Sequence, residues 1–415
     1  MTLQGGSVPE TVNQMFLIIF RNPNYIAMKR YILHIGYSKT GTSAIQHYLS
    51  RNRELLKKQK ILYPDIKLFG VWAHCQNHNM LGRALAGRLG WYGLPPREYF
   101  KQFENQSNEN NIEKVILSAE SFLGGVQPWD YENEDQYWDA SEKFVKKLGS
   151  FLSQHDVKII IYLRRQDHWL ESALNQTIKF GGLMADNLRM ASINKLIDIY
   201  SPRLNYLKVL NLWSDVFGAE SIQVGVYEKD RLMEQDIITD FCHSAGIDSS
   251  NLLAPVPDKS VENKSISRNL LEFKRILNAV KRPKYQERVI AEILFNLSSK
   301  YEDNFSNDYP LLDKSTRLSI LQKYKDSNQE IAKQYLQDDG ALFREPLPAL
   351  SNGEPETYSG LSTEDAVLFL LELDRYLSLP QTRFKLFRHW LAERLRSKSP
   401  FMHALFRKIY YLTGK

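Results

Sequence analysis

The fold is decided by the stretch Tyr31–Tyr48, which reads YILHIGYSKTGTSAIQHY. Its first five residues are apolar, aromatic or β-branched, apart from one histidine, and predict a short buried strand. Gly36 ends that strand, and from Ala44 onward apolar residues recur at the spacing of a helix. The stretch therefore predicts a strand, a tight loop of small residues, and the start of a helix.

The loop has the features of an anion-binding site. Its backbone N–H groups and the helix N-terminus attract negative charge, and Lys39 adds a full positive charge. Hydroxyl groups in the loop are further donors. We therefore expect a phosphorylated molecule to bind there, and an ordinary turn with a solvated lysine is the alternative. The loop residues concerned are Ser38, Lys39, Thr40, Gly41, Thr42 and Ser43.

The loop is close to the Walker A motif but does not match it. G-x-x-x-x-G-K-[ST] places the lysine after the second glycine, whereas Lys39 comes two residues before Gly41. An ATP-dependent kinase is the rival enzyme class, and it predicts the Walker order together with a magnesium-binding acid near the loop. The non-enzymatic rival is a membrane-recruited nucleotide-binding scaffold.

A carboxylate follows the second predicted strand. The run 114–118, KVILS, is apolar and is followed closely by Glu120. Functional groups of parallel α/β folds gather just past the carboxyl ends of strands, so Glu120 is the candidate general base. A helix-capping or solvated glutamate is the alternative.

An arginine leaves the third predicted strand. The run 158–163, KIIIYL, is followed by Arg164, and Ser172 lies eight residues further on, in the next predicted helix. The guanidinium group is a planar fork that suits phosphate, and the serine hydroxyl adds a donor. This pair is therefore a candidate phosphate site, and a generic junction with a salt-bridged arginine is the alternative.

Two histidines lie between the first two strands. His74 and His78 are four residues apart and would share one face of a helix. A metal site would need a third ligand nearby, and the sequence offers no obvious one, so we predict no metal. Surface or substrate-contacting histidines are the expectation. Further on, the polar residues 101–113 predict a loop or a frayed helix end, and 175–199, which includes Lys179, predicts a helix and a connection suited to substrate contact.

Composition narrows the class of protein. Of 415 residues, 43% are hydrophobic and 25% are charged, as in soluble globular proteins. The longest apolar run near the N-terminus, MFLIIF at 15–20, is far shorter than the ~20 residues of a membrane span. Two cysteines give neither a disulfide framework nor a zinc pattern, and they fit a reducing compartment. We therefore expect a cytoplasmic protein.

Charge is concentrated at the C-terminus. The net charge is +6, but 381–415 holds nine Lys/Arg and one acid, so the remainder is −2. This excludes a nucleic-acid-binding core. Basic and apolar residues interleave in this tail, which is typical of a helix lying on an anionic membrane surface, here the inner face of the membrane. Docking of the tail on the protein's own core is the alternative.

The order of the predicted elements gives the domain organisation. Strands alternate with helices up to residue 245, which predicts a parallel sheet of about five strands covered on both faces. We expect an N-terminal lead at 1–27, one domain at 28–346, a linker at 347–362 and the basic amphipathic helical tail at 363–415. Met28 is a candidate natural start, and a native peptide spanning Met15 to Lys29 would exclude it.

The motifs together resemble bacterial sulfotransferases that use 3′-phosphoadenosine 5′-phosphosulfate (PAPS), a P-loop-like group, and especially those similar to carbohydrate sulfotransferases. The resemblance covers about residues 28–346. The segments that carry it are HIGYSKTGTS at 34–43, LSAESF at 117–122, YLRRQDHWLES at 162–172, and the run from the tryptophan at 213 through FG to VYE at 226–228.

This resemblance implies a three-layer α/β/α fold and an in-line transfer of a sulfuryl group to an acceptor hydroxyl, with no metal. It implies that the 38–43 loop holds the 5′-phosphosulfate and that Arg164 and Ser172 hold the 3′-phosphate. Lys39 would stabilise charge on the leaving phosphate, and Glu120 would take the acceptor proton. Such families use either glutamate or histidine as base, so His74 and His78 stay rivals. A glycan or glycolipid is the expected acceptor, and a small hydroxylated metabolite is the alternative.

Overall fold

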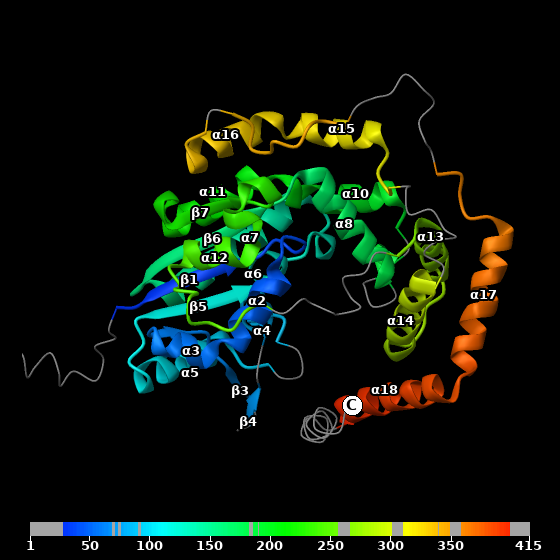
Figure 1. Cartoon of the computed structure of the whole chain (residues 1–415), viewed down its shortest axis with the longest axis horizontal. Helices are drawn as coiled ribbons and strands as arrows, with labels where there is room; N and C mark the ends of the chain where they lie inside the picture. Colours follow the sequence, from blue (N-terminus) through cyan, green and yellow to red (C-terminus); the bar gives the residue numbers. More distant parts are fainter. Residues whose placement is uncertain are drawn as a thin grey trace, which may run out of the picture.

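A five-stranded parallel sheet in the order β2-β5-β1-β6-β7 forms the centre of the molecule (Figure 1). The computed structural model describes residues 28–68, 71–73, 76–89, 93–181, 186–189, 191–255, 266–300, 310–338, 340–348 and 358–398. The strands of the sheet are β1 (Arg30–Ile35), β2 (Ile61–Leu62), β5 (Lys114–Ala119), β6 (Asp156–Leu163) and β7 (Ile222–Val226). A separate antiparallel pair consists of β3 (Ile66–Leu68) and β4 (Val71–Ala73).

Helices cover both faces of the sheet because its strands are apolar on both sides. Side chains alternate along β1, so Leu33 packs into the core on one face while Ile32 packs into the core on the other. The helices of the first face include α5 (Pro96–Glu109), α7 (Glu134–Leu152), α8 (Gln166–Lys179), α10 (Ile193–Tyr200) and α11 (Tyr206–Phe217). The second face is covered by α2 (Thr42–Arg51), α3 (Arg53–Lys58) and α12 (Ile237–Ala245). Short helices α4 (Asn79–Leu85), α6 (Ser121–Gly124) and α9 (Asp186–Arg189) lie in the connections.

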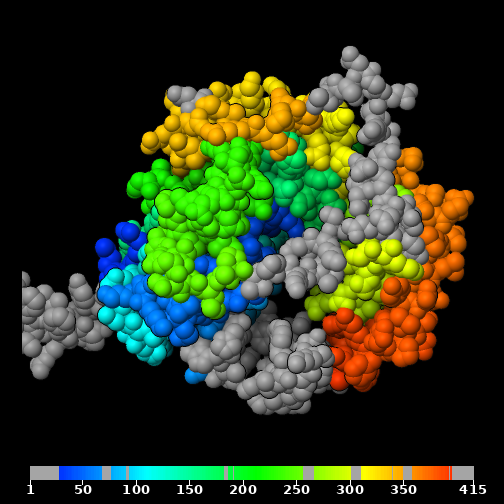
Figure 2. All heavy atoms as spheres, in the orientation of Figure 1, coloured from blue at the N-terminus to red at the C-terminus, as the bar shows by residue number. Residues whose placement is uncertain are grey.

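The C-terminal helices form two further groups. Helices α15 (Lys314–Lys323) and α16 (Lys325–Leu336) lie against α8 and α11 (Figure 1). Helices α13 (Arg268–Leu277), α14 (Lys284–Lys300), α17 (Thr363–Ser378) and α18 (Pro380–Lys398) share a third core, in which Phe273 contacts Phe369. Figure 2 shows this helical unit, coloured yellow-green to red, beside the body formed by the sheet and its helices.

The structure confirms the predicted α/β fold with about five parallel strands and a helical C-terminal region. Of the two alternatives for 101–113, a helix end fits and a loop does not, because α5 continues to Glu109 and buries Phe100 and Phe103. In the tail, α18 packs on α14 and Lys385 pairs with Glu292, so this part docks on the protein's own helices. Residues 399–415 lie outside the described part of the chain. Membrane contact and the division into domains stay predictions.

The strand order brings the polar residues that follow β1, β5 and β6 close together. Strand β1 lies between β5 and β6 and is paired in register with both, Ile35 opposite Ala119 and His34 opposite Ile160. The carboxyl ends of these three neighbours therefore lie at one edge of the sheet. The 36–43 loop emerges there between Glu120 and Arg164, at the kind of edge where open α/β sheets bind ligands.

Candidate functional site

The loop after β1 has a backbone suited to holding an anion. Lys39 and Gly41 both have positive φ, 73° and 77°, and Thr40 between them does not. Alternation of this kind turns successive N–H groups toward one point and makes an anion-binding concavity. Glycine adopts this conformation freely, whereas lysine does so at a cost. The left-handed Lys39 therefore marks the loop as a place where function constrains the backbone.

Two side chains hold this loop in place, one from α8 and one from the residue that follows β6. The indole Nε1 of Trp169 donates to the carbonyl of Ser38 at 2.9 Å, and Arg164 Nη1 donates to the carbonyl of Lys39 at 3.1 Å. Trp169 is fully buried, so the first of these bonds is shielded from water. The two contacts hold the lysine-bearing turn against the ends of the sheet.

Two of the predicted hydroxyl donors are used inside the loop. Thr40 Oγ1 donates to the carbonyl of Tyr37 at 2.6 Å, and Thr42 Oγ1 donates to the same carbonyl at 3.1 Å. Thr40 is buried and is not among the residues that line the large cavity described next, so its hydroxyl serves the loop itself. Ser43 is exposed and lines the cavity described next. Sequence spacing alone could not separate these three hydroxyls.

A large cavity of about 1030 Å³ opens over the loop and brings both sequence motifs together. Lys39, Gly41 and Ser43 of the loop line it together with Arg164 and Ser172. Arg164 is held by its bond to Lys39 and lies over the ring of Tyr227, with 5.9 Å between Cζ and the ring centroid.

The large cavity is positively charged. Five lysine or arginine side chains line it against two carboxylates, and one of these, Glu171, is paired with Arg317 at 3.0 Å. Burial, together with the neighbouring charge of Lys39, lowers the pKa of Lys179 to about 8. A cavity of this size and charge suits a ligand with several negative charges.

A smaller cavity of about 330 Å³ adjoins the large one, and Glu120 lines both. Ser38 and Gln176 are also shared between them. Glu120 directly follows β5 and precedes α6, so the end of the strand fixes its position. Burial raises the pKa of its carboxyl group, and the charge of Lys39 opposes that rise. A carboxylate with a raised pKa between two cavities is well placed to accept a proton from one bound molecule as it reacts with another.

The structure places His78 away from both cavities. Its ring is 0% exposed, the Ser118 N–H donates to Nδ1 at 3.0 Å, and Nε2 lies 3.1 Å from the carbonyl of Pro64. Both ring nitrogens therefore serve the backbone, which contradicts the expected substrate contact. His74 lies outside the described residues. Within the described ranges, no three His, Cys, Asp or Glu side chains are grouped as a metal ion would require.

Because His78 satisfies two buried backbone groups, the change His78→Leu is expected to lower the free energy of unfolding by at least about 2 kcal/mol, about 1–3 kcal/mol for each lost bond. Burial lowers the pKa of His78 to about 4, from the ordinary value of 6.5. Between pH 6.5 and 4, the His78 imidazole is therefore protonated in the unfolded chain but not in the folded one. The free energy of unfolding falls as the pH drops through this range.

Urea unfolding across this pH range would measure both effects, with His47→Leu, a half-buried histidine of α2, as the matched control. The acid-dependent loss should be smaller in His78→Leu than in the wild type. Wild-type stability together with weakened ligand binding in His78→Leu would instead restore the histidine as a substrate contact.

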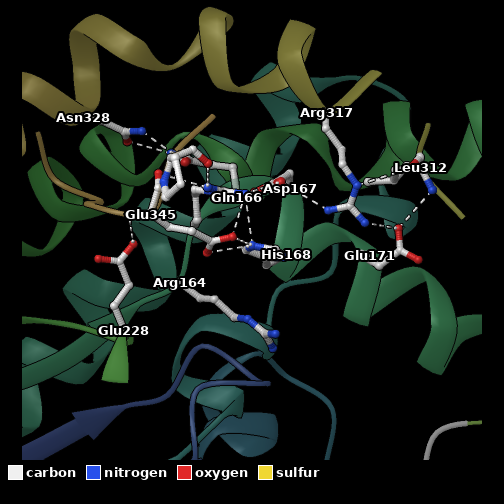
Figure 3. Close-up of polar contacts among 12 residues, drawn as sticks. Arg164, Gln166, Asp167, His168, Glu171, Glu228, Leu312, Arg317, Asn328 and Glu345 are labelled. Atoms are coloured by element: carbon white, nitrogen blue, oxygen red, sulfur yellow. Dashed lines mark hydrogen bonds and ion pairs between the residues drawn. The ribbon is translucent and has the colours of Figure 1, made fainter. Parts of the chain in front are cut away.

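A polar network that the sequence did not reveal fixes the start of α8 (Figure 3). Arg317 of α15 bonds Asp167 at 3.1 Å and Glu171 at 3.0 Å, and His168 lies 2.8 Å from the carboxylate of Glu345. These partners are about 150 or more residues apart along the chain, so no local pattern could pair them. The network anchors the helix that follows Arg164 and carries Ser172.

No helix in the described part of the chain is both long enough and apolar enough to cross a membrane.

Comparison with known proteins gives distant similarities only. No family model matches the chain. A curated relative, an uncharacterized protein of Archaeoglobus fulgidus, is 25% identical over 224 residues, which are 53% of this chain and 53% of that protein. The chain thus spans about half the length of the curated relative it matches. A solved structure, the sulfotransferase from Alicyclobacillus acidocaldarius, is similar with a TM-score of 0.36 and 15% identity, over 65% of this chain and 97% of that one. At this distance the likeness assigns no activity, and function rests on the geometry of the site.

Proposed function

We propose that this protein is a sulfotransferase that moves a sulfuryl group from PAPS to the hydroxyl of an acceptor. The observation that carries the proposal is the placement of Glu120 between two cavities, with Lys39 close enough to influence its pKa. The large cavity also joins the left-handed lysine loop to Arg164 and Ser172, which are the two groups that a nucleotide with phosphates at both ends requires.

The large cavity is the proposed donor site. The 5′-phosphosulfate would lie on the N–H groups of the 38–43 loop, beside Lys39, and the 3′-phosphate would lie between Arg164 and Ser172. Arg164 can reach both motifs, because its guanidinium already bonds the carbonyl of Lys39. The remaining cations of the cavity offset the high negative charge of such a donor.

The reaction then follows from the two sites. The acceptor oxygen attacks sulfur, the bond from sulfur to the oxygen of the 5′-phosphate breaks, and the acceptor proton passes to Glu120. The products are a sulfate ester and 3′-phosphoadenosine 5′-phosphate (PAP). Charge grows on the leaving phosphate oxygen, and the fixed cation Lys39 stabilises it there. The smaller cavity is the proposed acceptor site, with a sugar hydroxyl of a glycan or glycolipid at the cytoplasmic membrane face as the expected acceptor.

Calorimetry with three nucleotides tests the donor. PAP and AMP differ only in the 3′-phosphate, whereas ADP represents a kinase substrate or product. We expect PAP to bind more tightly than AMP by about tenfold or more, because hydrogen bonds to charged groups contribute about 1.5–3 kcal/mol. Arg164→Ala should remove this difference, and Arg164→Lys should restore part of it. Arg51→Ala, an exposed arginine at the end of α2, is the control.

Equal binding of PAP and AMP to the wild type, or an unchanged preference in Arg164→Ala, would reject the proposed donor site. Tighter binding of ADP than of PAP would point to the kinase class. Tight PAP binding without sulfuryl transfer to any offered hydroxyl, and without an effect of Glu120 substitution, would point to a nucleotide-binding scaffold.

A further inference from the structure

The smaller cavity has a cluster of aromatic side chains in its wall. Tyr37, Trp129, Trp169 and Tyr200 line it, and their rings pack on one another edge to face. The ring centroids of Trp129 and Tyr200 lie 5.6 Å apart, and those of Trp169 and Tyr200 lie 5.9 Å apart. Tyr37, Trp169 and Tyr200 are buried and hold the wall rigid, whereas Trp129 is only partly buried, so a ligand ring would pack mainly on Trp129.

An arginine is anchored at the far end of this cavity. Arg203 Nη2 donates to Gln127 Oε1 at 2.7 Å and to the carbonyl of Val126 at 3.1 Å, and its guanidinium lies over Trp129. Its Nε is buried and has no hydrogen-bond partner among the described residues. No carboxylate in the described part of the chain pairs with Arg203, so its charge is compensated by neutral oxygens only.

A second arginine adds to the positive charge. Arg83, from α4, also lines the cavity and makes no ion pair with the described residues. Arg88 is paired with Asp130, and its pKa is lowered by burial first and then by the charges of Arg203 and Arg83. Among the described residues, Glu120, the proposed base, is the one carboxylate that lines this cavity. A neutral ligand would leave this end of the cavity with uncompensated positive charge.

We infer that the acceptor is a small ring compound that carries both a hydroxyl and an anionic group, a carboxylate or a sulfate ester. The hydroxyl would face Glu120, the ring would pack on the aromatic wall, and the anionic group would bind Arg203 with Arg83. This inference rests on the proposed sulfotransferase function, and it narrows the acceptor to small acidic ring compounds, such as an acidic sugar or a phenolic acid.

The spacing within the cavity fits one ring. Glu120 precedes α6 and Gly124 ends it, and the guanidinium of Arg203 lies next to Gly124. Four residues of helix rise by about 6 Å, so the backbone positions of Glu120 and Gly124 are separated by roughly the width of a monocyclic ligand. The volume of 330 Å³ is at the lower end of ligand pockets, which also favours one ring over a longer segment of a polymer.

Matched pairs of probes test this inference on the full chain with PAP bound. Methyl β-D-glucuronide and methyl β-D-glucoside differ in one group, a carboxylate in place of a hydroxymethyl group. The same exchange separates 4-hydroxyphenylacetate from 4-hydroxyphenylethanol. Saturation-transfer NMR and calorimetry would measure binding, and radiolabelled PAPS would measure transfer. We expect the acidic member of at least one pair to bind about tenfold or more tightly than its neutral partner, because a charged hydrogen bond contributes that much.

Variants then assign the preference to the arginines. Arg203→Gln should weaken binding of the acidic probe alone, so that the acidic and neutral probes bind about equally. Arg203→Lys should retain part of the preference for the acidic probe. Arg83→Gln should have the same effect to a smaller degree, and Arg51→Gln should have none. Equal binding within both pairs, or no binding of either acid, overturns the inference. The proposed function is unaffected by that result as long as PAP binds the wild type more tightly than it binds Arg164→Ala. If PAP itself fails to bind, the proposed function falls, and this inference falls with it.

Discussion

Replacement of Glu120 by glutamine is expected to lower the rate of sulfuryl transfer by about 10²–10⁴-fold, the usual contribution of a general base. Glutamine has nearly the same shape and can still hydrogen-bond the acceptor, but it cannot take its proton. Glu120 lines both cavities, and it is not one of the groups proposed to bind either phosphate. The affinity for PAP should therefore change little. Steady-state rates and calorimetry on the same protein separate the two quantities.

The pH profile gives a second readout. Burial raises the pKa of Glu120 above its ordinary value of 4.5. A base must be ionised to act, so kcat/KM should fall as the pH drops through this raised pKa, at a higher pH than an exposed glutamate would show. Glu120→Gln should have no such acidic limb. Lys39 opposes the rise, so removal of its charge should move the limb to still higher pH.

Two variants control this result. Glu120→Asp keeps the carboxylate on a shorter side chain and should retain more activity than Glu120→Gln. Glu109→Gln changes an exposed glutamate at the end of α5 and should behave as the wild type. Near-normal turnover in Glu120→Gln would exclude this residue as the base and would return the search to the other polar side chains at the mouth of the smaller cavity.

The sequence predicted the three strands of this site and the polar residues that follow them. It did not predict how the strands are ordered in the sheet. The apolar runs before Lys39, Glu120 and Arg164 identified three buried strands, because a strand covered on both faces must be apolar throughout. The sequence of a single strand does not specify which strands lie beside it. Only the pairing of β1 with both β5 and β6 shows that the three polar groups share one edge.

The errors have a common physical cause, which is burial decided by distant residues. The polar composition of 101–113 left a loop and a frayed helix end as alternatives, yet Phe100, Phe103 and Ser107 fall on one buried stripe of a regular helix, α5. His78 was expected at the surface, but its two backbone partners come from Pro64 and from Ser118, 40 residues away. Helix α14, which the sequence analysis did not predict, depends on packing with α13, α17 and α18.

Removal of the Lys39 charge is expected to have the second large effect. Lys39→Met should lower the rate of transfer by about 10²–10³-fold, as does the loss of one fixed donor to a developing charge, and should weaken PAP binding as well. Lys39→Gly is the matched control for folding, since glycine accepts the left-handed conformation that costs other residues about 1–2 kcal/mol. A glycine variant that is at least as stable as Lys39→Met and equally inactive would show that the loss is one of charge.

Lys39→Met should also change the pKa of Lys179. The charge of Lys39 contributes to the lowered pKa of Lys179, about 8 in the wild type, so Lys39→Met should raise that pKa. Lys179 loses its charge as the pH rises through 8, and PAP binding should weaken above that pH in the wild type but only at higher pH in Lys39→Met. NMR titration of ¹³C-labelled lysine, with Lys179→Met to assign the signal, measures the shift directly. An unchanged pKa would mean that the two ammonium groups do not share one anion site, and the donor would then have to bind without Lys179.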